Sequence, residues 1–84
     1  MYWDVITVKV ESYLTLKVSF SDDLTGYVHF LPEHLTGVFT PLKDPHFFAQ
    51  VAVKEGVVTW AGELELAPDA MHHAIKEKGE WILS

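Results

Sequence analysis

The chain has 84 residues, of which 49% are hydrophobic and 21% are charged, and its net charge is −6. This length fits one domain over residues 1–84, and the composition excludes both a disordered chain and a transmembrane one. The chain contains no Arg, Cys or Asn. The absence of Cys excludes disulfides, thiolate chemistry and Cys-ligated metal sites. The six lysines are scattered, so we expect no direct nucleic-acid binding.

A β-meander is predicted for the first thirty residues. Residues 5–10 alternate, and the side chains expected on the buried face are Ile6, Val8 and Val10. Glu11-Ser12 is expected to connect this strand to a second one over residues 13–20. The buried face of that second strand would carry Leu14, Leu16, Val18 and Phe20. A third strand is predicted over residues 27–30.

Short helical turns and a hairpin are predicted for the middle of the chain. Pro32 to Gly37 fits one helical turn that begins with Pro and is followed by Gly, and Asp44-Pro45 fits an N-cap followed by Pro. Two apolar runs flank Lys54-Glu55-Gly56, which is typical of a hairpin loop. A turn over residues 61–63 and a short strand over residues 64–66 follow.

The clearest helix is predicted over residues 68–78. Pro68 fits its start, and Gly79 fits the stop after its last turn. Its apolar stripe would contain Met71, Ala74, Ile75 and the stem of Lys78. Residues 80–84 are interpreted as a tail. The fold class is therefore α+β, an antiparallel β-meander or sheet of about five to six short strands with one C-terminal α-helix and one or two single-turn helices.

The polar residues give no strong sign of catalysis. Asp69 lies one helical turn from His72 and His73, which makes these three residues weak candidates for a metal site. Adjacent histidines point about 100° apart on a helix, so a solvated face is the favoured interpretation. Asp22-Asp23 is expected to form local hydrogen bonds in a turn. No known catalytic motif is present, so we predict no catalytic residue and no cofactor, and we favour a non-enzymatic protein.

The aromatic residues have two interpretations, cover for the rim of the core or an interface with another protein, and we pursue the interface. Trp60 ends an apolar strand and is expected in the core, whereas Trp3, Tyr13, Tyr27 and Trp81 are the candidate interface residues. The predicted function is a non-enzymatic protein-interaction module, a homodimer with an antitoxin-like or regulatory role toward another small protein. The alternative is a small-molecule or metal-binding domain that uses His and carboxylate side chains.

Three stretches carry a resemblance to a known family. These are Trp3 and Val5 leading through the alternating second strand to Ser21-Asp22, then Pro41-Leu42 with the Asp44 turn, and then Trp60 followed by Leu66-Ala67-Pro68-Asp69. Together they resemble the small bacterial α+β proteins of domain-of-unknown-function family 2442. The chain has His29 where the family usually has Asp, and Ala61-Gly62-Glu63 where it tends to have Pro-Asn-Gly.

The resemblance implies a small module that pairs with proteins. Some relatives carry an added helix-turn-helix, and some lie beside a small partner gene in arrangements that look like toxin–antitoxin pairs. A small basic protein would suit the charge of −6. The N-terminus has no secretory signal pattern and no apolar run is long enough to cross a membrane, so we expect a cytoplasmic protein without membrane contact.

Overall fold

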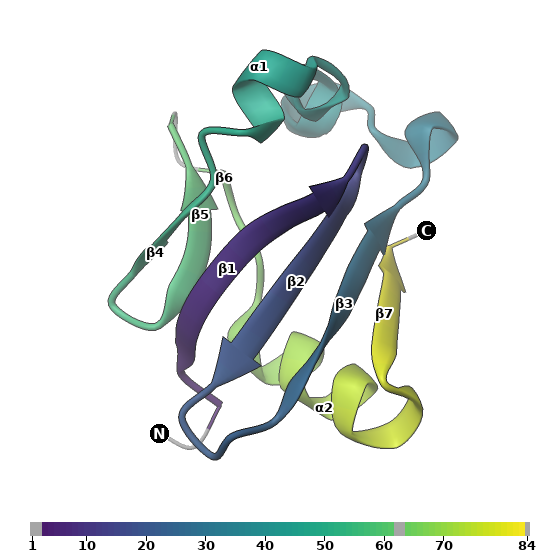
Figure 1. Ribbon diagram of the computed structural model, residues 1–84. Coiled ribbons are helices and arrows are strands. Elements are labelled where there is room, and N and C mark those ends of the chain that lie inside the picture. Colours follow the sequence, from purple (N-terminus) through teal and green to yellow (C-terminus); the bar gives the residue numbers. More distant parts are fainter. Residues whose placement is uncertain (1–2, 62–63, 84) are drawn as a thin grey trace.

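Two sheets and one long helix make up the structure, a computed structural model that describes residues 3–61 and 64–83 (Figure 1). Within these residues, one sheet has the order β1-β2-β3-β7 and the other has the order β4-β5-β6. The strands are β1 (Val5–Ser12), β2 (Thr15–Phe20), β3 (Thr25–Phe30), β4 (Ala52–Lys54), β5 (Val57–Trp60), β6 (Leu64–Glu65) and β7 (Glu80–Leu83). The helical segments are η1 (Pro32–His34), η2 (Gly37–Lys43), α1 (Pro45–Phe48) and α2 (Pro68–Lys78). The α+β class is confirmed.

The β-meander is also confirmed, but its first turn lies two residues later than predicted. β1 continues through Glu11 and Ser12, and the turn is Tyr13-Leu14. Leu14 takes a left-handed conformation with φ 56°, which costs a non-glycine residue roughly 1–2 kcal/mol. Its side chain is 4% exposed, and burying a leucine contributes about 1.5–3 kcal/mol, which offsets that cost.

The predicted buried face of the first strand is wrong at both ends, since Ile6 and Val10 are exposed. Val5 is buried and pairs with Phe20, whereas Ile6 is 58% exposed. The register between β1 and β2 shifts between Val5 and Thr7 because β1 contains one extra residue there. Such a β-bulge reverses the alternation for the residues that follow it. This is why Val8 packs against the core, as predicted, while Val5 takes the place expected for Ile6.

The core lies between the inner face of the four-stranded sheet, the three-stranded sheet and the helices. Its fully buried large side chains are Leu16, Val18, Phe20, Val28, Leu42, Phe48, Val58, Met71 and Ile75. Trp60 is 4% exposed, which confirms its predicted core position. Its indole N–H donates to the Phe48 carbonyl oxygen at 3.0 Å, so its one polar atom is satisfied in the core.

The middle of the chain follows the predicted turn chemistry with one difference. η1 begins at Pro32, but Gly37 begins η2 instead of following the first turn. The Asp44 side chain caps α1 by accepting from the His46 backbone N–H at 2.9 Å. In the β4–β5 hairpin, Glu55 and Gly56 both have positive φ, 54° and 81°. The predicted turn over residues 61–63 includes Gly62 and Glu63, which lie outside the described residues.

The last helix occupies the predicted residues. α2 spans Pro68–Lys78, and Gly79 closes it with φ 80° while its N–H donates to the Ile75 carbonyl oxygen at 2.7 Å. The expected tail is wrong, because residues 80–83 form β7. This strand pairs in parallel with β3, so the sheet is not wholly antiparallel. Parallel strands need a long crossover connection, and α2 is the last element, within the described residues, of the connection between β3 and β7.

Gly26 allows α2 to approach β3 closely. It lies in β3 and is buried. A Cβ atom at this position would collide with the Ile75 side chain and would lie 2.8 Å from the Gly79 carbonyl oxygen. A backbone atom cannot move away as the end of a flexible side chain can, so this contact requires glycine.

We expect Gly26→Ala to lower the free energy of unfolding by about 1–3 kcal/mol, because the added methyl group overpacks the contact between β3 and the end of α2. Urea denaturation followed by circular dichroism measures the change. The control is Thr25→Val, an exposed position in the same strand, which should stay within about 0.5 kcal/mol of the wild type. Equal effects of the two substitutions would contradict the close approach at Gly26.

Candidate interaction surface

The inward side of α2 carries a histidine that the sequence analysis placed on a solvated face. His72 is 4% exposed and packs edge-on against the Phe20 ring, with centroids 4.9 Å apart. Its Nε2 lies 2.8 Å from Oδ2 of Asp22 in the turn between β2 and β3. This contact therefore joins the first half of α2 to the turn between β2 and β3, although the two residues are fifty positions apart in the sequence.

Asp22 serves both its own turn and the helix. Its Oδ1 accepts from the Leu24 backbone N–H at 3.1 Å, which confirms the predicted local hydrogen bonding in this turn. The hydrogen bond to His72 is the main cause that lowers the pKa of the Asp22 carboxyl group below its ordinary value of 3.8. The ionised carboxylate is therefore the form that the folded structure favours.

The candidate metal residues point in different directions. His72 turns inward to Asp22, whereas His73 is exposed and lies 3.9 Å from the Glu77 carboxylate one turn along the helix. Asp69 is exposed in the first turn of α2. In the part of the chain that the structure describes, no group of three or more His, Asp or Glu side chains is arranged to hold a metal ion. The geometry gives the metal alternative no support there.

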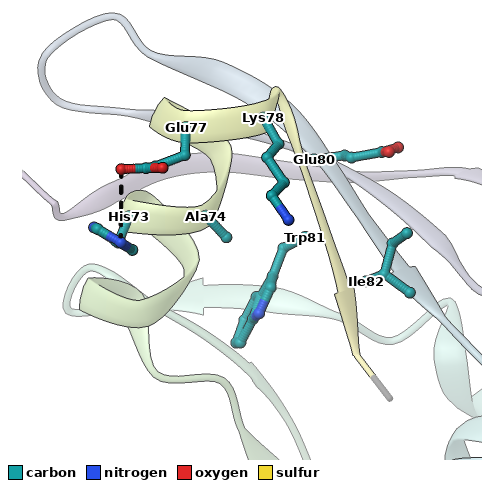
Figure 2. Close-up of a pocket in the computed structure, with 7 residues that line it drawn as sticks. All are labelled: His73, Ala74, Glu77, Lys78, Glu80, Trp81 and Ile82. Carbon is teal, nitrogen blue, oxygen red and sulfur yellow. Dashed lines mark ion pairs between the residues drawn. The ribbon is translucent and has the colours of Figure 1, made fainter.

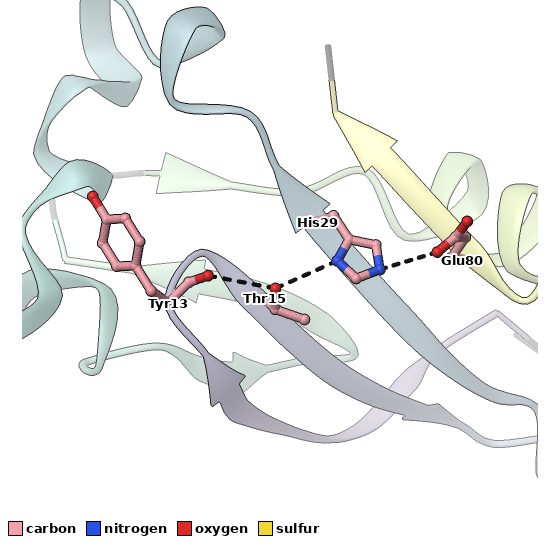
Figure 3. Close-up of polar contacts among 4 residues, drawn as sticks. All are labelled: Tyr13, Thr15, His29 and Glu80. Atoms are coloured by element: carbon pink, nitrogen blue, oxygen red, sulfur yellow. Dashed lines mark hydrogen bonds and ion pairs between the residues drawn. The ribbon is translucent and has the colours of Figure 1, made fainter.

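A chain of polar contacts crosses the outer face of the four-stranded sheet (Figure 3). The Thr15 hydroxyl donates to the Tyr13 carbonyl oxygen at 3.4 Å and lies 3.3 Å from Nδ1 of His29. Nε2 of His29 lies 3.0 Å from the Glu80 carboxylate on β7. His29 is half-buried. These contacts link β2, β3 and β7, so they help to hold the last strand on the sheet.

A groove of about 350 Å³ runs between α2 and β7 (Figure 2). The helix contributes His73, Ala74, Glu77 and Lys78, and the strand contributes Glu80, Trp81 and Ile82. The Trp81 ring extends into the space between the two elements, and the Lys78 side chain reaches along the strand toward it. The lining side chains include two glutamates and one lysine, so the groove carries both charge signs beside the Trp81 ring.

The structure divides the four candidate interface residues into two regions. Tyr27 and Trp81 lie near β7 on opposite faces of the sheet, since Tyr27 is level with Glu80 in the β3–β7 register. Tyr27 is 39% exposed and Trp81 is half-buried in the groove. Trp3 and Tyr13 lie at the two ends of β1, the opposite edge strand. The Tyr13 hydroxyl donates to the Lys43 carbonyl oxygen at 2.9 Å, so this ring also fastens the first turn to η2.

Ile82 is the surface residue that the sequence analysis missed. It is 50% exposed on β7, beside His29 on β3. The signal was present, since Trp81, Ile82 and Leu83 form a run of residues common in strands directly after a helix stop. A second hollow of about 160 Å³ lies at the other end of β3 and is mainly apolar, lined by Phe30, His34, Leu35, Phe39, Leu66 and Leu83.

We expect the Asp22–His72 pair to stabilise the fold above the ordinary carboxyl pKa of 3.8 and to lose this effect as the pH falls through the lowered folded pKa. The reason is that the folded state then holds a carboxyl group that binds protons less readily than the unfolded state does. Asp22→Asn should therefore destabilise at neutral pH and lose most of this deficit in strong acid. Urea denaturation midpoints across this pH range measure the difference.

The matched control for this experiment is Asp23→Asn. Asp23 is exposed and has φ 70°, a conformation that asparagine tolerates equally well. Its stability relative to the wild type should change little with pH. Parallel pH profiles for the Asp22 and Asp23 variants would show that the contact with His72 does not lower the carboxyl pKa.

The comparisons with known proteins agree with the family suggested by the sequence. No helix among the described residues is long and apolar enough to cross a membrane. No curated protein and no solved structure matches the chain. The family model described as protein of unknown function (DUF2442) matches residues 5–77, which cover β1 through nearly all of α2. The chain therefore belongs to the DUF2442 family.

Proposed function

We propose that this protein is a non-enzymatic protein-interaction module that acts in the cytoplasm and associates with a second copy of itself. The observation that carries the proposal is the exposure of apolar side chains at the β7 side of the first sheet. Ile82 is 50% exposed on β7, and Tyr27 is 39% exposed on the neighbouring strand β3. Clustered apolar side chains at a sheet edge are typical of surfaces that bind another protein.

The size of the chain adds to this argument. A domain of 84 residues buries a smaller share of its surface than a large one does, and self-association is a common way to cover what remains. The large apolar side chains that stay exposed within the described residues are Ile6, Val10, Tyr13, Tyr27, Phe39 and Ile82. A homodimer interface would remove part of this set from water at both copies simultaneously.

A different small protein is the second partner that we propose. The net charge of −6 favours a basic partner, because opposite charge accelerates encounter and disfavours acidic competitors. An antitoxin-like or regulatory role would follow from such a pairing. The alternative of a small-molecule site has one feature in its favour, the mainly apolar hollow beside Phe39, although its volume of about 160 Å³ is smaller than that of most ligand pockets.

Sedimentation equilibrium of the purified chain tests the proposal. We expect a mass of two chains at micromolar concentration and dissociation on dilution, as for an interface of modest size. A single-chain mass throughout the micromolar range would contradict self-association. Repeating the measurement in the presence of a candidate basic protein distinguishes the two partners, because a heterodimer replaces the homodimer only if both compete for the same surface.

A further inference from the structure

Among the described residues, β1 and β7 form the edges of the four-stranded sheet, and they differ in how open they are to pairing with another chain. β1 contains two register shifts, between Val5 and Thr7 and between Val10 and Ser12, and it carries Lys9 on its length. Bulges and edge lysines are the usual means by which sheets avoid pairing with other chains. Its start is also covered, since the Val5 N–H donates to the Gly56 carbonyl oxygen at 2.9 Å.

β7 has none of these protections within the described residues. It pairs with β3 in an unbroken register from Tyr27↔Glu80 to Phe30↔Leu83. Figure 1 shows it as the outermost strand, with no other element beyond it. The Tyr27 N–H donates to the Gly79 carbonyl oxygen at 3.3 Å. In a parallel ladder this pattern turns the backbone N–H and C=O groups of Glu80 and Ile82 away from β3.

We propose that β7 pairs antiparallel with β7 of a second copy, so that the two four-stranded sheets join into one continuous sheet across a two-fold axis. This inference rests on the proposed self-association and names the surface that performs it. A strand of the same sequence fits because two identical antiparallel strands are related by a two-fold axis, so each contact between the copies occurs twice. The partner strand then supplies the hydrogen bonds that Glu80 and Ile82 lack along the outer edge.

The side chains select one register. Glu80 opposite its own copy would place like charges together, which destabilises a sheet. A register that places Trp81 opposite Trp81 of the second copy avoids this repulsion. In that register Glu80 of each copy forms a hydrogen-bonded pair with Ile82 of the other. The two tryptophans then form a non-hydrogen-bonded pair, in which side chains approach most closely. The groove of about 350 Å³ beside α2 provides space for the partner's ring.

Charge and local shape support the same register. The Glu80 carboxylate already contacts His29 at 3.0 Å within its own chain, so it has a polar partner there and lies opposite Ile82 of the other copy. Leu83 would lie opposite Gly79 of the other copy. A Cβ atom at Gly79 would have no atom within 4 Å, so there is open space beside this residue for a side chain from the second copy.

The sharpest test removes one backbone donor and leaves the folded chain intact. The N–H of Ile82 points away from β3, so Ile82→Pro removes no hydrogen bond between β3 and β7. We expect this variant to keep its circular dichroism spectrum and its dissociation constant for the dimer to rise about a hundredfold or more, since two symmetric hydrogen bonds are lost. Ile82→Val keeps the donor and the β-branched shape and should remain dimeric.

A second test uses the natural absence of cysteine. Trp81→Cys places a single thiol opposite its copy at a spacing that suits a disulfide, so mild oxidation should yield a covalent dimer rapidly. Tyr27→Cys, one strand further in, is the control and should cross-link much more slowly. This readout decides the matter if Ile82→Pro fails to fold.

The outcomes separate this inference from the proposed function. A wild-type dimer that survives Ile82→Pro, with Trp81→Cys no faster to cross-link than Tyr27→Cys, overturns the β7 pairing and leaves self-association through another surface. A monomeric wild type overturns both proposals. A wild-type dimer that becomes monomeric in Ile82→Pro and cross-links through Trp81→Cys supports both.

Discussion

The close contact between Gly26 and the end of α2 is the constraint on which the architecture depends. Without a Cβ at Gly26, the Ile75 side chain and the Gly79 carbonyl group can lie directly against β3. The same carbonyl group then accepts the Tyr27 N–H, which begins the parallel pairing of β7. The absence of a Cβ atom at Gly26 thus sets the distance between α2 and the sheet, and with it the position of β7. The groove beside Trp81 and the open edge of β7 follow from that placement.

Local chemistry explains which elements were predictable from the sequence. The bounds of α2 follow from Pro68 and Gly79, which act within one helical turn of the residues that they delimit. The cap at Asp44 and the hairpin at Gly56 are equally local. Features that depend on distant residues were not predictable. The bulge after Val5 depends on the neighbouring strand β2, and β7 becomes a strand only because β3 is beside it.

The candidate site shows the same limit. His72 and Asp22 are fifty positions apart, so the spacing rules that linked Asp69 to His72 could not find the pair. The sequence analysis named Trp81 and Tyr27 as candidate interface residues, but it could not tell that they lie on opposite faces of the sheet. The sequence also could not predict the exposure of Ile82. Residues 80–84 were interpreted as a tail, and only a strand has two faces that separate exposed side chains from buried ones. The face of the sheet on which each β7 side chain lies can be assigned only once the pairing of β7 with β3 is known.

The two edges of the first sheet differ in a way that stability alone does not require. Bulges and a lysine on β1 cost regular pairing with β2, yet they protect that edge from other chains. Selection against aggregation would act on both edges alike, since exposed apolar side chains lie on both, Ile6 and Val10 on β1 and Ile82 on β7. The unbroken register of β7 and the exposed Ile82 on it are the observations that support the proposed pairing of this strand with a second copy. The asymmetry between β1 and β7 therefore supports the proposed self-association more directly than the overall apolar content of the chain does.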